Sequence, residues 1–223
     1  MTLIRPLLIS RHLSIALFTA LFISPAFSAA DHSAVAILSQ HLNKMSSMTA
    51  QFQQRIKDYR GTVLQEANGL LKVKRPRRFY WHTQQPYEHL VVTDGSILWL
   101  YDIDLEQITK QAFTADLDKA PALLLSGEID EISKQFQVEL LSTHASTNEK
   151  TIGFQLTPLS IDSLFKVLTI HFENQQITSM SLQDSFDQLT EIQFSEVKLN
   201  PTVDDKFFLF TPPDGIDVIS NEP

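Results

Sequence analysis

Few side chains in this sequence combine the types and spacing that catalysis or metal binding needs. His82 and the Glu88-His89 pair could meet across a hairpin, but no His-Glu-x-x-His spacing supports a metal site, so we favour solvent-facing strand histidines. Asp102 and Asp104 lie in a stretch that is typical of a turn rather than of an acid–base pair. The chain has no cysteine, no nucleophile elbow and no glycine-rich phosphate loop. We therefore expect a protein that is not an enzyme and that holds no metal or cofactor.

One basic cluster stands out in an otherwise acidic chain. It consists of Lys72, Lys74, Arg75, Arg77 and Arg78. It could be a solvated strand face, or it could dock an acidic partner or lipid head groups near the mouth of a cavity. Arg75 precedes Pro76 at the end of a predicted strand, where its guanidinium could reach carbonyls of a loop or a helix end. A guanidinium has five donors in a fixed fork, so it could bind several carbonyls at once.

The element that must position Arg75 is a set of four predicted strands between residues 70 and 101. Apolar and polar residues alternate along the first two strands, Pro76 and Pro86 interrupt the pattern, and Asp94-Gly95 predicts a hairpin turn. Both tryptophans of the chain lie in this stretch. The side chains expected on its apolar face are Leu71, Val73, Phe79, Trp81, Leu90, Val92, Trp99 and Tyr101.

The flanking segments predict a mainly β protein with about three helices. A helix is expected over Asp31–Met48, with Leu38 and Leu42 on its apolar stripe, and two short helices are expected in 120–125 and 128–134. About ten or eleven strands account for the rest up to Phe210. An antiparallel sheet of that length should curl into an open, incomplete β-barrel. The helices would then form a lid over its concave face.

The aromatic content leaves two interpretations of that concave face open. Fifteen phenylalanines and two tryptophans can fill the interior of a small barrel, which is the more common arrangement. They can also line a cavity for an apolar ligand. Periodicity does not separate a filled core from a ligand cavity, because both require apolar residues on the same face.

The first thirty residues have the layout of a cleavable secretory signal. Arg5 and Arg11 precede an apolar run over 13–23, and small residues follow in 26–30. An uncleaved membrane anchor is the alternative, although the run is shorter than the roughly twenty residues that a bilayer requires. Cleavage would make the formal charge of −8 more negative by two and would leave residues 31–223 as a single domain. Such an acidic, exported chain is not expected to bind nucleic acid.

The sequence resembles the LolA family of periplasmic carriers of outer-membrane lipoproteins. The resemblance rests on an ordered set of short motifs that covers essentially the whole chain after the signal. The motifs are LKVKRP (71–76), FYW (79–81), QP (85–86), VTDG (92–95), LWLY (98–101), AP (120–121), FQLTP (154–158) and FTPPxG (210–215).

The resemblance implies a monomeric periplasmic chaperone with an open barrel and a helical lid. It implies that lipoprotein acyl chains bind between them, that the inner-membrane ATP-binding-cassette complex LolCDE loads the carrier, and that the outer-membrane receptor LolB unloads it. It makes Arg75 the clasp that holds the lid shut. It also adds residues outside the central strands to the acyl-chain site, namely Leu38, Leu42, Leu123, Leu124 and Phe154. A half-barrel that senses a lipidated ligand and regulates a membrane protein is the alternative, and an enzyme that acts on lipids is a weaker third one, for which no candidate catalytic residue can be named.

Overall fold

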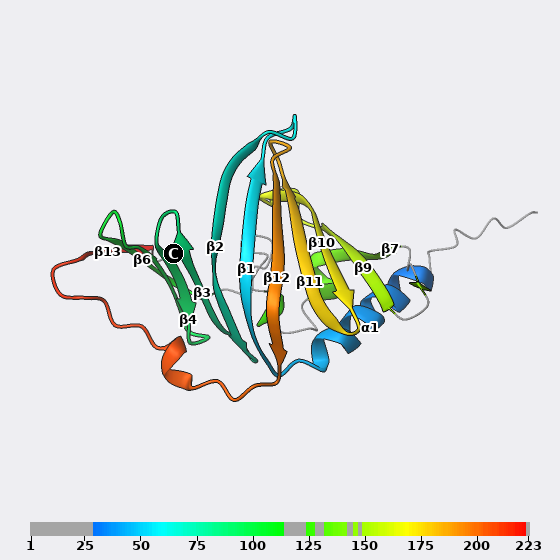
Figure 1. Cartoon of the computed structure of the whole chain (residues 1–223), viewed down its shortest axis with the longest axis horizontal. Helices are drawn as coiled ribbons and strands as arrows, with labels where there is room; N and C mark the ends of the chain where they lie inside the picture. The colour runs from blue at the N-terminus through cyan, green and yellow to red at the C-terminus, as the bar shows by residue number, and fades with distance from the viewer. Residues whose placement is uncertain (1–28, 114–123, 128–131, 142–144, 147–148, 222–223) are drawn as a thin grey trace, which may run out of the picture.

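The computed structural model describes residues 29–113, 124–127, 132–141, 145–146 and 149–221. These residues form one strongly curved, open β-sheet with a long helix against its concave side (Figure 1). The predicted signal over 1–30 therefore lies outside the described residues, apart from its last two positions. None of the helices in the described part of the chain is long and apolar enough to cross a membrane.

Over the described ranges the sheet contains thirteen strands, more than the ten or eleven predicted. Its strands are β1 (Ser47–Lys57), β2 (Val63–Lys74), β3 (Arg78–Gln85), β4 (His89–Thr93), β5 (Ile97–Asp102), β6 (Gln107–Ala112), β7 (Phe136–Leu141), β8 (Ala145–Ser146), β9 (Glu149–Pro158), β10 (Phe165–Glu173), β11 (Gln176–Asp184), β12 (Leu189–Leu199) and β13 (Asp217–Asn221). The helices are α1 (Ala29–Asn43), α2 (Ile132–Gln135) and the 3-10 helix η3 (Asp205–Phe208).

The order of the strands explains why the sheet stays open. It runs β13-β6-β5-β4-β3-β2-β1-β12-β11-β10-β9-β7, with β8 paired to β9, so β13 and β7 are two separate edges. Neighbours along the path are antiparallel except β13 and β6, which pair in parallel. Long, twisted antiparallel sheets curl, and here the curl creates the concave face that the sequence predicted.

Helix α1 covers part of that concave face because one stripe of it is apolar. Ala34, Leu38 and Leu42 recur every four residues and are almost fully buried. They belong to one core cluster with side chains from strands on both sides of the curve, including Phe52 of β1 and Phe154 of β9. The predicted helix was too long at its C-terminal end, since Met48 is the second residue of β1.

The prediction of a three-helix lid is not supported. Among the described residues the α-helices are α1, of fifteen residues, and α2, of four. Residues 124–127 form a short turn, and most of the two short helices predicted around it falls outside the described residues. Within the described part of the chain, the cover of the concave face is therefore α1 together with the 124–127 turn, and Ile132 of α2 is buried in the same core cluster.

The convex face of the sheet has a cover of its own, which the sequence did not predict. The segment after β12 crosses this face and places the Phe210 ring against Trp99 and Tyr101 of β5. Val203 and Phe208 of the same segment are buried. The last strand was predicted to end at Phe210, but a further strand, β13, follows and pairs with β6 at the sheet edge.

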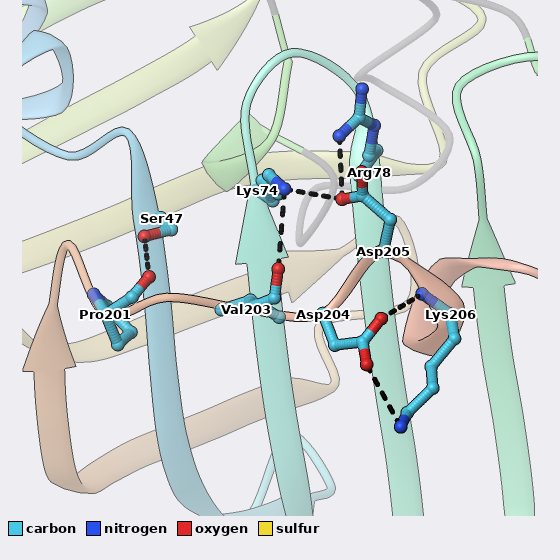
Figure 2. Close-up of polar contacts among 8 residues, drawn as sticks. All are labelled: Ser47, Lys74, Arg78, Pro201, Val203, Asp204, Asp205 and Lys206. Atoms are coloured by element: carbon cyan, nitrogen blue, oxygen red, sulfur yellow. Dashed lines mark hydrogen bonds and ion pairs between the residues drawn. The ribbon is translucent and has the colours of Figure 1, made fainter.

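Polar contacts fasten the start of this C-terminal segment to β1, β2 and β3 (Figure 2). Ser47 donates a hydrogen bond to the carbonyl oxygen of Pro201, and Asp205 accepts from both Lys74 and Arg78. The hydrogen bond from Lys74 and the two positive charges lower the pKa of the Asp205 carboxyl. Part of the basic cluster is thus neutralised within the chain rather than free for an acidic partner.

We expect Phe210→Ala to release the C-terminal segment from β5. Losing two aromatic contacts should cost about 2 kcal/mol, which corresponds to a fall in melting temperature of roughly 4–8 °C for a domain of this size. Tryptophan emission should shift to the red as Trp99 meets water. Leu209→Ala is the matched control, because that side chain is 66% exposed. An equal effect of the two variants would show that the Phe210 contacts contribute nothing specific.

Candidate functional site

The concave face carries a continuous apolar wall centred on Trp81. The Trp81 ring of β3 stacks on the Phe52 ring of β1, two strands away, with ring centroids 3.8 Å apart. It also lies nearly parallel to the Phe79 ring. Gly69 of β2 pairs with Phe52 and makes this stacking possible, because a Cβ at Gly69 would lie 1.9 Å from the His82 carbonyl oxygen. Close strand approach at one glycine thus positions the largest side chain of the site.

The structure brings together most of the residues predicted for the site. One core cluster contains Leu38, Leu42, Leu71, Val73, Phe79, Trp81, Leu124 and Phe154. They come from α1, β2, β3, β9 and the 124–127 turn, which are far apart in the sequence. The remaining predicted contact from the lid, Leu123, lies outside the described residues.

The sequence left the phase of β4 and β5 relative to the concave face open, and the contact residues chosen on these two strands are wrong. Trp81 pairs with Val91, and Val91 pairs with Leu100, so these residues share the concave face. The side chains on these two strands that were predicted to bind acyl chains point instead to the convex face. They are Leu90, Val92, Trp99 and Tyr101. Apolar residues occupy both faces of these strands because the C-terminal segment covers the second face, so alternation alone could not identify the inner one.

Sequence reasoning therefore missed three residues of the apolar wall. Leu98 belongs to the core cluster, and Val91 and Leu100 pack against it. The β3–β4 hairpin could have identified them. Its turn length fixes which residue of β4 lies opposite Trp81, and that residue must share the face of Trp81. The apolar wall thus extends along the concave face from β9 across the sheet to β5, and every strand in between contributes side chains to it.

Arg75 does contact the turn that covers the wall, although through one carbonyl and not several. Its Nη1 donates to the Gly127 carbonyl oxygen at 2.9 Å, and the backbone N–H of Arg77 donates to Ser126 at 2.7 Å. Among the residues that the structure describes, the buried Nε and Nη2 atoms of Arg75 have no hydrogen-bond partner. Burial lowers the pKa of the guanidinium to about 10, so the group is still charged at neutral pH.

These contacts define a closed arrangement of the site. Leu124 and Leu125 are buried in the core cluster, directly beside the Arg75 contacts to the same turn. A bulky apolar ligand could enter this region only if the 124–127 turn moved away. The unpaired donors of Arg75 make the closed arrangement less favourable than its hydrogen bond alone would suggest, because a buried charged group without partners is costly.

Next to Trp81 the concave face opens into a cavity of about 550 Å³. Trp81, Val91 and Ala67 form its apolar floor, while His89 and Asp102 are among its polar walls. Burial lowers the pKa of His89, and the charge of Asp102 opposes that shift only in part. The lowered pKa favours the neutral imidazole.

The two histidines considered for a metal site lie on opposite faces of the sheet. His82 faces the convex side, where its Nε2 lies 2.7 Å from a carboxylate oxygen of Glu88. His89 faces the concave side, because it pairs with Thr83 in the β3–β4 register. Within the described residues no group of three or more potential ligand side chains is close enough to hold a metal.

The fold and the site together define an open-sheet scaffold whose apolar concave face lies under α1 and the short 124–127 turn. The family model of the outer membrane lipoprotein carrier protein LolA matches residues 43–211. The chain belongs to this LolA family, as the motifs in its sequence indicated.

Individual relatives agree with this assignment. The chain is 43% identical over 201 residues to the outer-membrane lipoprotein carrier protein of Hahella chejuensis, covering 90% of this chain and 95% of the relative. It is 41% identical over 189 residues to that of Pseudomonas paraeruginosa, covering 85% and 88%. Among solved structures, a conserved protein from Thermus thermophilus shares the fold, with a TM-score of 0.57 at 12% identity over 85% of this chain and 99% of that one.

Proposed function

We propose that the chain is a periplasmic chaperone that shields the acyl chains of lipoproteins and delivers them to the outer membrane. The observation that carries this proposal is the continuous apolar wall from β9 to β5 under a cover that Arg75 contacts through the Gly127 carbonyl. The relatives that match nearly their full length bear the name of outer-membrane lipoprotein carriers. A regulatory sensing module is not favoured, since these relatives are named as carriers.

The energetics of the cargo require such a wall. Each buried methylene contributes about 0.8 kcal/mol, so one sixteen-carbon chain is worth roughly 12 kcal/mol. A carrier must bind this chain and also release it. In our proposal the 124–127 turn closes over Leu71 and Trp81 in the empty state, and the acyl chains displace it on loading. The free energy of closing then offsets part of the binding energy at release.

Arg75 acts in this proposal as the clasp of the cover. Its hydrogen bond to Gly127 forms only in the closed state, while its unpaired donors keep that state only marginally favourable. Loading would come from an ATP-driven inner-membrane complex of the LolCDE type, and unloading would go to a receptor of the LolB type. Neither handover needs a nucleotide on this chain.

Co-purification tests the proposal directly. The chain, expressed with its N-terminal segment in a Gram-negative host, should be recovered from the periplasm with lipidated proteins bound. Treatment with detergent should strip this cargo and leave a folded protein. Recovery of an unliganded chain under conditions in which a Pseudomonas carrier retains lipoprotein would contradict the proposed function.

A further inference from the structure

The turn between β2 and β3 binds two different segments with its four basic residues. These residues are Lys74, Arg75, Arg77 and Arg78. The inner pair contacts the 124–127 turn, because the Arg75 guanidinium and the backbone N–H of Arg77 both donate to its carbonyls. The outer pair contacts the C-terminal segment, because Lys74 and Arg78 both donate to Asp205. One short turn therefore connects the cover of the apolar wall with the segment that crosses the convex face.

Strand phase places the outer pair on the convex face. Val73 and Phe79 belong to the core cluster of the concave face, so their neighbours Lys74 and Arg78 point to the other side of the sheet. Lys74 and Arg78 are also direct cross-strand partners. Figure 2 shows both side chains directed at the Asp205 carboxylate, which lies 2.9 Å from Nη1 of Arg78. The carboxylate thus bridges the two strands at the base of the turn.

Asp205 relieves a repulsion that this arrangement would otherwise contain. Like charges directly opposite each other on neighbouring strands destabilise the strand pair, and Lys74 and Arg78 are two such charges. The hydrogen bond from Lys74 and the charges of both cations lower the pKa of the Asp205 carboxyl, as expected for a bridging counterion. The strand ends that carry Arg75 are consequently held together from the convex side.

We propose that Asp205 is a positioning residue for the Arg75 clasp, so that docking of the C-terminal segment on the convex face favours the closed cover on the concave face. The inference deepens the proposed carrier function and rests on the 124–127 turn being its cover. Coupling between two sites requires a physical element that both of them bias, and the β2–β3 turn is that element. Release of Asp205 would loosen the base of the turn, and Arg75 would then hold the cover less firmly. The C-terminal segment thereby controls access to the apolar wall from the opposite side of the sheet.

Thiol labelling tests the coupling, because the chain has no cysteine of its own. Leu125→Cys introduces a single thiol into the cover at a position that is 0% exposed, so an alkylating reagent reaches it only when the cover opens. We expect Asp205→Asn, which keeps an acceptor atom but removes the charge, to raise the labelling rate about fivefold. In an Arg75→Leu background the same substitution should raise the rate less than about twofold, since no clasp is left to position. Asp205→Glu should keep labelling slow.

Two controls separate this coupling from a general loss of stability or of charge. Asp204→Asn removes the neighbouring charge and should leave the labelling rate unchanged, because Asp204 contacts Lys206 within its own segment. Ile170→Cys places the thiol in the fully buried centre of β10, where Asp205→Asn should not accelerate labelling.

Four results would overturn the coupling. They are an unchanged rate at Leu125→Cys, an equal rise at Ile170→Cys, an equal rise in Asp204→Asn, and a fivefold rise that persists without Arg75. Since the labelling uses no lipoprotein, each of these results would leave the carrier function standing. Failure of the co-purification would contradict the carrier function and would not alter the labelling result.

Discussion

Arg75→Leu is expected to load lipoprotein normally and to pass it to an outer-membrane receptor about ten times less efficiently. Without the guanidinium, the Gly127 carbonyl loses its donor in the closed state, which costs that state about 1–3 kcal/mol. Closing then offsets less of the cargo's binding energy, so the loaded state persists. The measurement is transfer of a labelled lipoprotein from the carrier to immobilised receptor over time.

The burial of Arg75 acts in the opposite direction, so a second variant is needed to separate the two effects. Removing a buried charge with two unpaired donors should favour the closed state. Arg75→Lys is the matched variant, because it keeps the charge and one donor to Gly127, and it should transfer better than Arg75→Leu. Transfer at the wild-type rate by both Arg75→Leu and Arg75→Lys would show that the hydrogen bond to Gly127 gives the closed state no net stability, and the clasp would have to be abandoned.

Trp81→Glu should abolish cargo binding while the sheet remains folded. The substitution removes the largest ring of the apolar wall and puts a carboxylate where an acyl chain must lie, next to Phe52. Excluding a charge from hydrocarbon costs several kcal/mol, which is enough to reduce occupancy by more than a hundredfold. Co-purification of lipoprotein measures binding, and far-ultraviolet circular dichroism measures the fold.

The other tryptophan provides the control for this prediction. Trp99→Glu makes the same chemical change on the convex face, against Phe210, and should leave cargo binding intact although it loosens the C-terminal segment. Trp81→Phe should retain binding, because an aromatic ring still covers Phe52. Loss of cargo in Trp99→Glu with binding preserved in Trp81→Glu would mean that the two faces are assigned the wrong way round.

The sequence alone supported the fold class and the centre of the site. Alternation identified Leu71, Val73, Phe79 and Trp81 as one face because the positions between them are polar or amphipathic, so only one phase buries the apolar side chains. The stripe on α1 was equally clear, since a single helix face carries Leu38 and Leu42. The ordered motifs identified the family, which the comparisons confirm.

Only the tertiary structure decided which face of β4 and β5 points inward, and which residue Arg75 reaches. Both faces of those strands are apolar because a segment more than a hundred residues away, ending in Phe210, covers the outer one. Likewise, the Gly127 carbonyl meets Arg75 only through the curl of the sheet. A local sequence pattern indicates whether a side chain is buried or exposed. Which segment buries it depends on contacts between residues far apart in the sequence, and no local pattern contains these.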